Sequence, residues 1–179
     1  TWTDRRGRQG HSLWVQSDLT VVEQVTARGS TWLDRQLLSS EPVESGGRFG
    51  EMIEQAKRDR AEHLVSEGLA TKHGGRINMA RNVLYTLRDR DLAAASEALT
   101  ERTGLPHRPS AEGETVSGTY RQRLQLASGR FAMIDNGLGF ELVPWRPQLD
   151  KHLGQHVTGI VKPGGGIDWA LGRSRGIGI

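Results

Sequence analysis

The sequence predicts an α+β protein in which a helical part is followed by a small β-barrel. Up to about Gly104, apolar residues recur every three to four positions, as on one face of an α-helix. From about Glu114 onward they alternate with polar residues, as in strands that have one solvated face. The stretch 105–113 between these parts is rich in Pro and polar residues, which is typical of a linker.

Residues 1–47 are interpreted as a connecting segment with a strand followed by helices. The strand is expected over 12–16. Val21, Val22 and Val25 recur at helical spacing, and either Ser17 or Asp18 is expected to cap that helix. A second helix is expected from Thr31 to Leu38, before a loop over 39–47. Because the chain starts at Thr1 without an initiator Met, it is expected to be a piece of a longer protein.

Residues 48–104 are predicted to form a helical, winged-helix-like domain. A long amphipathic helix is expected to end at Gly68, since glycine is common just after a helix. Strands over 69–72 and 76–79 would then form a hairpin around His73-Gly74-Gly75. A second long helix is expected over 80–102. In a winged helix, one helix can enter the major groove of DNA while the hairpin, or wing, reaches the adjacent backbone.

Residues 114–172 are predicted to form the barrel, and 173–179 a flexible tail. Five strands are expected, over 120–126, 130–134, 138–143, 156–161 and 167–171. One or two helical turns over 148–153 separate the third strand from the fourth. This order is typical of a five-stranded OB-like barrel, and an SH3-like barrel is the alternative.

Composition narrows the classes of protein. The chain has 179 residues, of which 25% are charged and 35% hydrophobic, as expected for a globular protein. No apolar run approaches the roughly 20 residues that a membrane-spanning helix needs, so no membrane insertion is expected. Cysteine is absent, which excludes disulfides and thiolate sites and fits a cytoplasmic protein.

Basic residues concentrate in the middle of the sequence. Between Lys57 and Arg90, eight basic residues face four acidic ones, a local net charge of +4 against +3 for the whole chain. These charges either contact DNA phosphates or simply solvate two helices. The predicted DNA-binding residues are Lys57, Arg58, Arg60, Lys72, His73, Arg76 and Arg81, together with Arg121 and Arg123 on a barrel strand.

Two tryptophans in the barrel allow two interpretations. Trp145 and Trp169 lie near Arg121, Arg123 and Arg146 in the predicted strands and turns. As exposed rings beside arginines they would stack on single-stranded bases. As buried rings they would fill the core of a small barrel.

No constellation of catalytic residues is visible, and no metal or cofactor site is predicted. His152 and His156 are four residues apart, but Gly154 between them ends the helix that would pair them. Tyr85 and Tyr120 have no neighbouring metal cluster and are expected to pack rather than to act as nucleophiles. The run Gly164–Gly166 is not followed by a predicted helix, so a hairpin loop is expected there instead of a phosphate site.

Several segments resemble a known family. The run Thr31-Trp32-Leu33-Asp34-Arg35-Gln36-Leu37 is one of them, as are residues 126–134 and Leu171-Gly172-Arg173. The most specific segment is Phe140-Glu141-Leu142-Val143-Pro144-Trp145-Arg146-Pro147. Together they resemble a C-terminal domain of the VirD2-type relaxase and mobilisation-nuclease family.

The resemblance implies a function in conjugative DNA transfer. Relaxases of this kind nick one strand at a transfer origin through a tyrosine and stay bound to its 5′ end, with a divalent metal held by histidines. Those parts lie at the N-terminus of such proteins and are missing from this sequence. The resemblance thus implies a non-catalytic C-terminal accessory region that contributes DNA binding during transfer of a plasmid or integrative element.

The partners implied are transfer-origin DNA, duplex or single-stranded, and other relaxosome components. The alternative is a protein-docking or translocation-signal module that the coupling protein of a type IV secretion system recognises. The implied location is the bacterial cytoplasm, with translocation of the parent protein into the recipient cell.

Overall fold

The computed structural model describes residues 19–40 and 46–171 of the chain. The chain divides into two compact units, Thr1–Arg88 and Asp89–Ile179, whose boundary falls inside one long helix. The predicted boundaries between domains lie elsewhere, at 47/48 and on either side of the linker 105–113. The strand expected over 12–16 and the tail at 173–179 lie outside the described residues.

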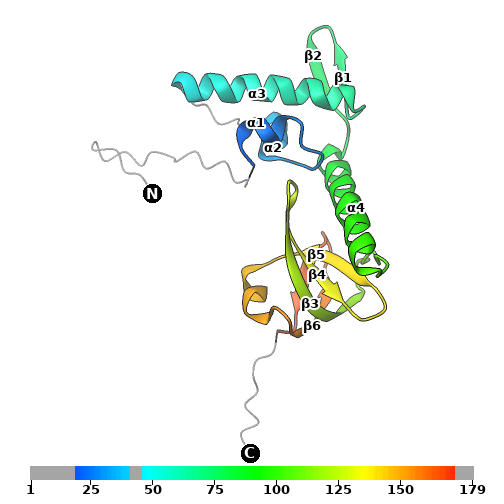
Figure 1. The fold of residues 1–179 in the computed structure, drawn as a ribbon. Helices are drawn as coiled ribbons and strands as arrows, with labels where there is room; N and C mark the ends of the chain where they lie inside the picture. Colours follow the sequence, from blue (N-terminus) through cyan, green and yellow to red (C-terminus); the bar gives the residue numbers. More distant parts are fainter. Residues whose placement is uncertain (1–18, 41–45, 172–179) are drawn as a thin grey trace, which may run out of the picture. The chain divides into compact units, whose positions relative to one another are not determined.

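The α+β class is confirmed, with helices first and an antiparallel sheet after them (Figure 1). The helical part contains α1 (Val21–Val25), α2 (Trp32–Leu38), α3 (Gly47–Ser66), a hairpin of β1 (Ala70–His73) and β2 (Arg76–Met79), and α4 (Val83–Thr103). The hairpin and both long helices form where the sequence pattern predicted them. None of the helices within the described residues is long and apolar enough to cross a membrane.

Two capping boxes start the short helices. Thr20 caps α1, and the Glu23 carboxylate accepts a hydrogen bond of 2.7 Å from the Thr20 backbone N–H. Thr31 caps α2 in the same way with Asp34. Each pair satisfies backbone N–H groups that a helix start leaves free. The cap expected at Ser17 or Asp18 was wrong, because the helix begins at Val21 and the pair Thr20 and Glu23 has the required spacing.

The short helices pack against α3 in one hydrophobic cluster. Its buried members are Val21, Trp32, Leu33, Ile53 and Ala56. With five and seven residues, α1 and α2 are too short to be stable alone, so their stability depends on this contact. The residues interpreted as a connecting segment therefore supply part of the core that α3 buries.

The second unit is built on a five-stranded antiparallel sheet in the order β5-β4-β3-β6-β7. Its strands are β3 (Thr115–Leu126), β4 (Gly129–Asp135), β5 (Phe140–Pro144), β6 (His156–Val161) and β7 (Ile167–Trp169), and the 3-10 helix η1 (Pro147–His152) lies between β5 and β6. The long central strand β3 pairs with β6 over 115–119 and with β4 over 119–126.

The predicted closed barrel was wrong for the described residues. The edge strands β5 and β7 are not hydrogen-bonded to each other, so the sheet is open. Strand β7 has only three residues and therefore offers few backbone groups for a closing ladder. One face of the sheet buries a cluster that includes Val116, Tyr120 and Leu149, while Met133 and Phe140 on the other face pack against Leu99 of α4.

Candidate nucleic-acid interface

The hairpin of β1 and β2 is an exposed basic arm. Residues 71–76 are all exposed, and the hairpin stands beside the C-terminal turns of α3 (Figure 1). From Gly68 to Arg88 the sequence contains four Lys and Arg residues, namely Lys72, Arg76, Arg81 and Arg88, and no Asp or Glu. Lys72, His73, Arg76 and Arg81 are all exposed. The arm is therefore basic in sequence, and the carboxylate that approaches Lys72 is supplied by Glu62 of α3.

The tip and the base of the arm are fixed by different means. At the tip, Gly74 and Gly75 have φ values of 55° and 80°, a conformation that glycine adopts without a steric penalty. At the base, Leu69 and Ala70 are buried beside Val83, and the Ala80 N–H donates to the Leu69 carbonyl at 2.8 Å. The packed base holds an otherwise solvated hairpin in place.

Carboxylates and amides of α3 engage basic side chains of that helix and of the hairpin. Lys57 Nζ lies 3.1 Å from a carboxylate oxygen of Glu54. Arg58 donates a hydrogen bond of 2.8 Å to the side-chain carbonyl of Gln55. Lys72, on the hairpin, reaches Glu62 on α3 at 2.5 Å. Lys57 is therefore partly neutralised by its own helix, Lys72 by the neighbouring helix, and Arg58 is engaged by a neutral amide.

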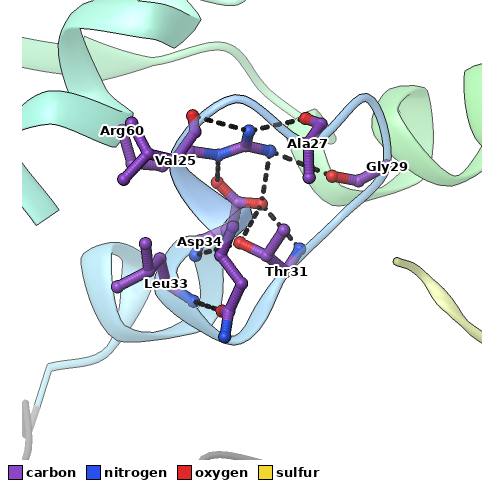
Figure 2. Close-up of polar contacts among 8 residues, drawn as sticks. Val25, Ala27, Gly29, Thr31, Leu33, Asp34 and Arg60 are labelled. Atoms are coloured by element: carbon purple, nitrogen blue, oxygen red, sulfur yellow. Dashed lines mark hydrogen bonds and ion pairs between the residues drawn. The ribbon is translucent and has the colours of Figure 1, made fainter. Parts of the chain in front are cut away.

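Arg60 was predicted to contact DNA, and the structure places it in the core instead. Its side chain is 0% exposed. Figure 2 shows its guanidinium held by the Asp34 carboxylate, at 2.8 and 2.9 Å, and by three carbonyl oxygens of the α1–α2 connection. All five N–H donors of the guanidinium are used in this way. A side chain so enclosed has no donor left for a phosphate, so Arg60 leaves the set of candidates.

A shallow pocket of about 360 Å³ lies between α3 and the hairpin. Its apolar lining comes from Leu37, Ala61 and Ile77. Five charged side chains complete it, namely Glu54, Lys57, Arg58, Glu62 and Lys72. Three positive and two negative groups leave it close to neutral, so the pocket itself is not a strong anion site.

On the sheet, the basic residues differ in their surroundings. Arg121 lies at a bulge in β3 and donates to Asp135 at 3.1 Å, which occupies it in an ion pair. Arg123 is exposed and places its guanidinium carbon 5.0 Å from the centre of the Trp145 ring. Arg130, which was not among the predicted binding residues, lies over the same ring at 5.7 Å.

The tryptophans follow the core interpretation in part. Trp145 and Trp169 are half-buried and pack against the cluster on one face of the sheet. The guanidiniums of Arg123 and Arg130 also lie over the Trp145 ring, so this residue contacts both the core and exposed side chains. Arg146 is exposed.

Neither tyrosine lies in a reactive setting. Tyr120 is 2% exposed and packs in the sheet core, as expected, and its burial raises the pKa of its hydroxyl. A nucleophile needs the opposite shift. Tyr85, which was expected to pack, is instead 61% exposed on α4. Within residues 19–40 and 46–171, no group of three or more His, Asp or Glu side chains is placed to hold a metal ion.

Comparison with known protein families assigns the chain to a family. A family model described as "Protein of unknown function (DUF3363)" matches residues 2–178. The chain belongs to the DUF3363 family. No curated protein and no solved structure matches it significantly. The match covers the hairpin arm of the DUF3363 chain, its buried Arg60 and both clusters of the sheet, so the features described above lie within the family's extent.

Proposed function

We propose that this DUF3363 chain is a non-catalytic C-terminal accessory region of a conjugative relaxase, and that it contributes DNA binding. The observation that carries the proposal is the exposed hairpin arm with Lys72, His73 and Arg76 and no acidic residue between Gly68 and Arg88. Cationic side chains on a protruding arm neutralise phosphates and release counterions, which supplies sequence-independent affinity. The segments that resemble relaxases connect that affinity to transfer-origin DNA.

The order of elements supports a winged-helix-like reading of the first unit. Three helices precede the hairpin, and α3 and the hairpin are consecutive in the chain, as a recognition helix and its wing would be. The pairing of Lys57 with Glu54 on α3 favours the wing over the helix for phosphate contacts, and Lys72 on the wing would exchange its Glu62 partner for a phosphate. Binding of this kind positions the protein on DNA without reading its sequence.

The sheet topology supports an OB-like reading of the second unit. Strand β3 pairs with both β4 and β6, β5 lies outside β4, and η1 joins β5 to β6. An OB-fold is likewise a partly open five-stranded Greek-key barrel. In a fully closed OB-like barrel, the edge strands β5 and β7 would be the two that pair.

A protein-docking module for a type IV secretion coupling protein is the second candidate function. Exposed apolar side chains on α3 favour it, since Phe49 and Met52 are 44% and 42% exposed and lie one turn apart. Such residues often mark protein contacts. Docking through them would need little contact with phosphates.

The experiment that tests the proposal measures DNA binding at several salt concentrations. Fluorescence anisotropy with a labelled duplex compares the wild-type chain with the double variant Lys72→Ala and Arg76→Ala. If each side chain meets one phosphate, the double substitution lowers the slope of log affinity against log salt by about 2. Both residues are exposed, so stability should change by less than about 0.5 kcal/mol.

Two further variants sharpen this test. Glu62→Gln removes the carboxylate that pairs with Lys72 and should tighten duplex binding, because the ammonium is then free for a phosphate. Lys151→Ala with Lys162→Ala removes two exposed positive charges outside the arm and should change binding less. If wild type and the hairpin variant bind with equal affinity and slope, the arm is only a solvated face and the docking function takes its place.

A further inference from the structure

One end of the sheet gathers polar and aromatic side chains on a single face. Gln125 on β3 lies directly opposite Arg130 on β4. The backbone N–H of Trp145, just after β5, donates to the backbone carbonyl of Arg130 at 2.9 Å, so these three residues form a row across the strands. Arg123 lies opposite Ala132, which places its side chain on the same face as the row.

In this row, one tryptophan ring holds two arginines. The guanidinium carbons of Arg123 and Arg130 lie 5.0 and 5.7 Å from the centre of the Trp145 ring, within the range of cation–π attraction. Trp145 is half-buried against the sheet core, whereas both arginines are exposed. The ring is therefore a fixed base for two side chains that would otherwise be mobile in solvent.

Among the described residues, neither guanidinium has an anionic partner. Within the described parts of the chain, neither Arg123 nor Arg130 forms an ion pair with a carboxylate, in contrast to Arg121 with Asp135. Two positive charges on one ring repel each other, and an anion between them would relieve that repulsion. A stacked guanidinium keeps its in-plane N–H groups free, in a fork that matches two phosphate oxygens.

We propose that Arg123, Arg130 and Trp145 form a site for the phosphate backbone of single-stranded nucleic acid. The choice of nucleic acid as ligand rests on the proposed function. The choice of a single strand rests on the side chains that form the site. Planar guanidiniums and the exposed amide of Gln125 can stack on and hydrogen-bond to bases, and only an unpaired strand presents its bases to such groups.

The test uses the full chain and a labelled oligothymidylate, with a duplex of equal length for comparison. Arg123→Ala with Arg130→Ala should weaken oligothymidylate binding and lower its salt slope by about 1.4, from about 0.7 for each contact to a single strand. Duplex binding should stay unchanged. Arg123→Lys with Arg130→Lys should keep the salt slope but weaken binding, because lysine keeps the charge and loses the planar fork.

Arg121→Ala is the matched control, since Arg121 is already engaged by Asp135 and should contribute little. Unchanged oligothymidylate binding in the Arg123 and Arg130 double alanine variant would overturn the proposal. Displacement of the oligonucleotide by polyglutamate at equal charge concentration would also overturn it, in favour of an acidic peptide ligand. Lys72→Ala with Arg76→Ala reports separately on the hairpin, so loss of one site is distinguishable from loss of the other.

Discussion

At the scale of single residues, the buried pair of Arg60 and Asp34 organises the first unit. Arg60 comes from α3, and its guanidinium donates to the carbonyls of Val25, at the end of α1, and of Ala27 and Gly29, between α1 and α2. The Asp34 carboxylate also accepts from the Thr31 backbone N–H at 2.7 Å. One carboxylate thus caps α2 and neutralises the arginine, which ties three helices to one polar centre.

Substitution of Asp34 tests how much this centre contributes. Asp34→Ala leaves the Arg60 charge buried without its partner, so the free energy of unfolding should fall by about 3–5 kcal/mol. Asp59→Ala is the matched control on the exposed face of α3, with an expected change within about 0.5 kcal/mol. Urea unfolding followed by circular dichroism measures both. An Asp34 variant as stable as the Asp59 variant would show that the pair does not stabilise the fold.

At the scale of elements, the central strand β3 holds the sheet together because it pairs with two neighbouring strands. It pairs with β6 along its first half and with β4 along its second, and the change of partner falls at Thr119. Next to that point lies Gly118, where an added Cβ atom would stand 2.6 Å from the carbonyl oxygen of Asp135 at the end of β4. The close approach of the two strands therefore requires a residue without a side chain.

Gly118→Ala is expected to destabilise the sheet, because backbone atoms of Asp135 would have to move. Overpacking of this kind costs about 1–3 kcal/mol. Gly166→Ala is the matched control, since its Cβ would meet only the end of the Lys162 side chain at 3.5 Å, an ordinary contact. Thermal unfolding of the two variants measures the difference. Equal melting temperatures would mean that the strands can separate at Gly118 without cost.

At the scale of the whole molecule, the two units have separate hydrophobic cores. The clusters around Leu33 and Leu64 draw their members from the first unit, and those around Leu149 and Leu99 draw theirs from the second. Helix α4 contributes to both, with Val83 and Leu87 in one cluster and Leu99 in another. Each unit therefore gains its burial energy largely from its own residues.

Cavity-forming substitutions should accordingly act on one unit at a time. Leu33→Ala, at a side chain with 0% exposure, should destabilise the first unit by about 2–5 kcal/mol. Hydrogen exchange should then accelerate in α1 to α3 and the hairpin and stay slow in β3 to β6. Leu149→Ala, also at 0% exposure, should give the reverse pattern. Equal loss of protection in both units after either substitution would show that they unfold as one.

Local patterns in the sequence determined most of the elements. Periodicity placed α3 and the second half of β3, over 120–126, and glycine placed the turns at Gly74 and Gly137. The capping pairs Thr20 with Glu23 and Thr31 with Asp34 have the spacing of a capping box, although the first cap was expected at Ser17 or Asp18. These features depend on interactions between residues a few positions apart, and such interactions can be predicted from the residue types at those positions.

Tertiary structure decided what the charged and aromatic residues do. Lys57, Arg58 and Arg60 are neighbours of similar charge, yet only packing against α1 and α2 buries Arg60 with Asp34, 26 positions away. Likewise, only the pairing of β3 with β4 brings Arg123 and Arg130 onto one tryptophan ring. Helical or strand periodicity shows which face a side chain occupies. Whether that face meets solvent, a carboxylate or an aromatic ring depends on contacts between distant segments, because burial and pairing are properties of the assembled chain.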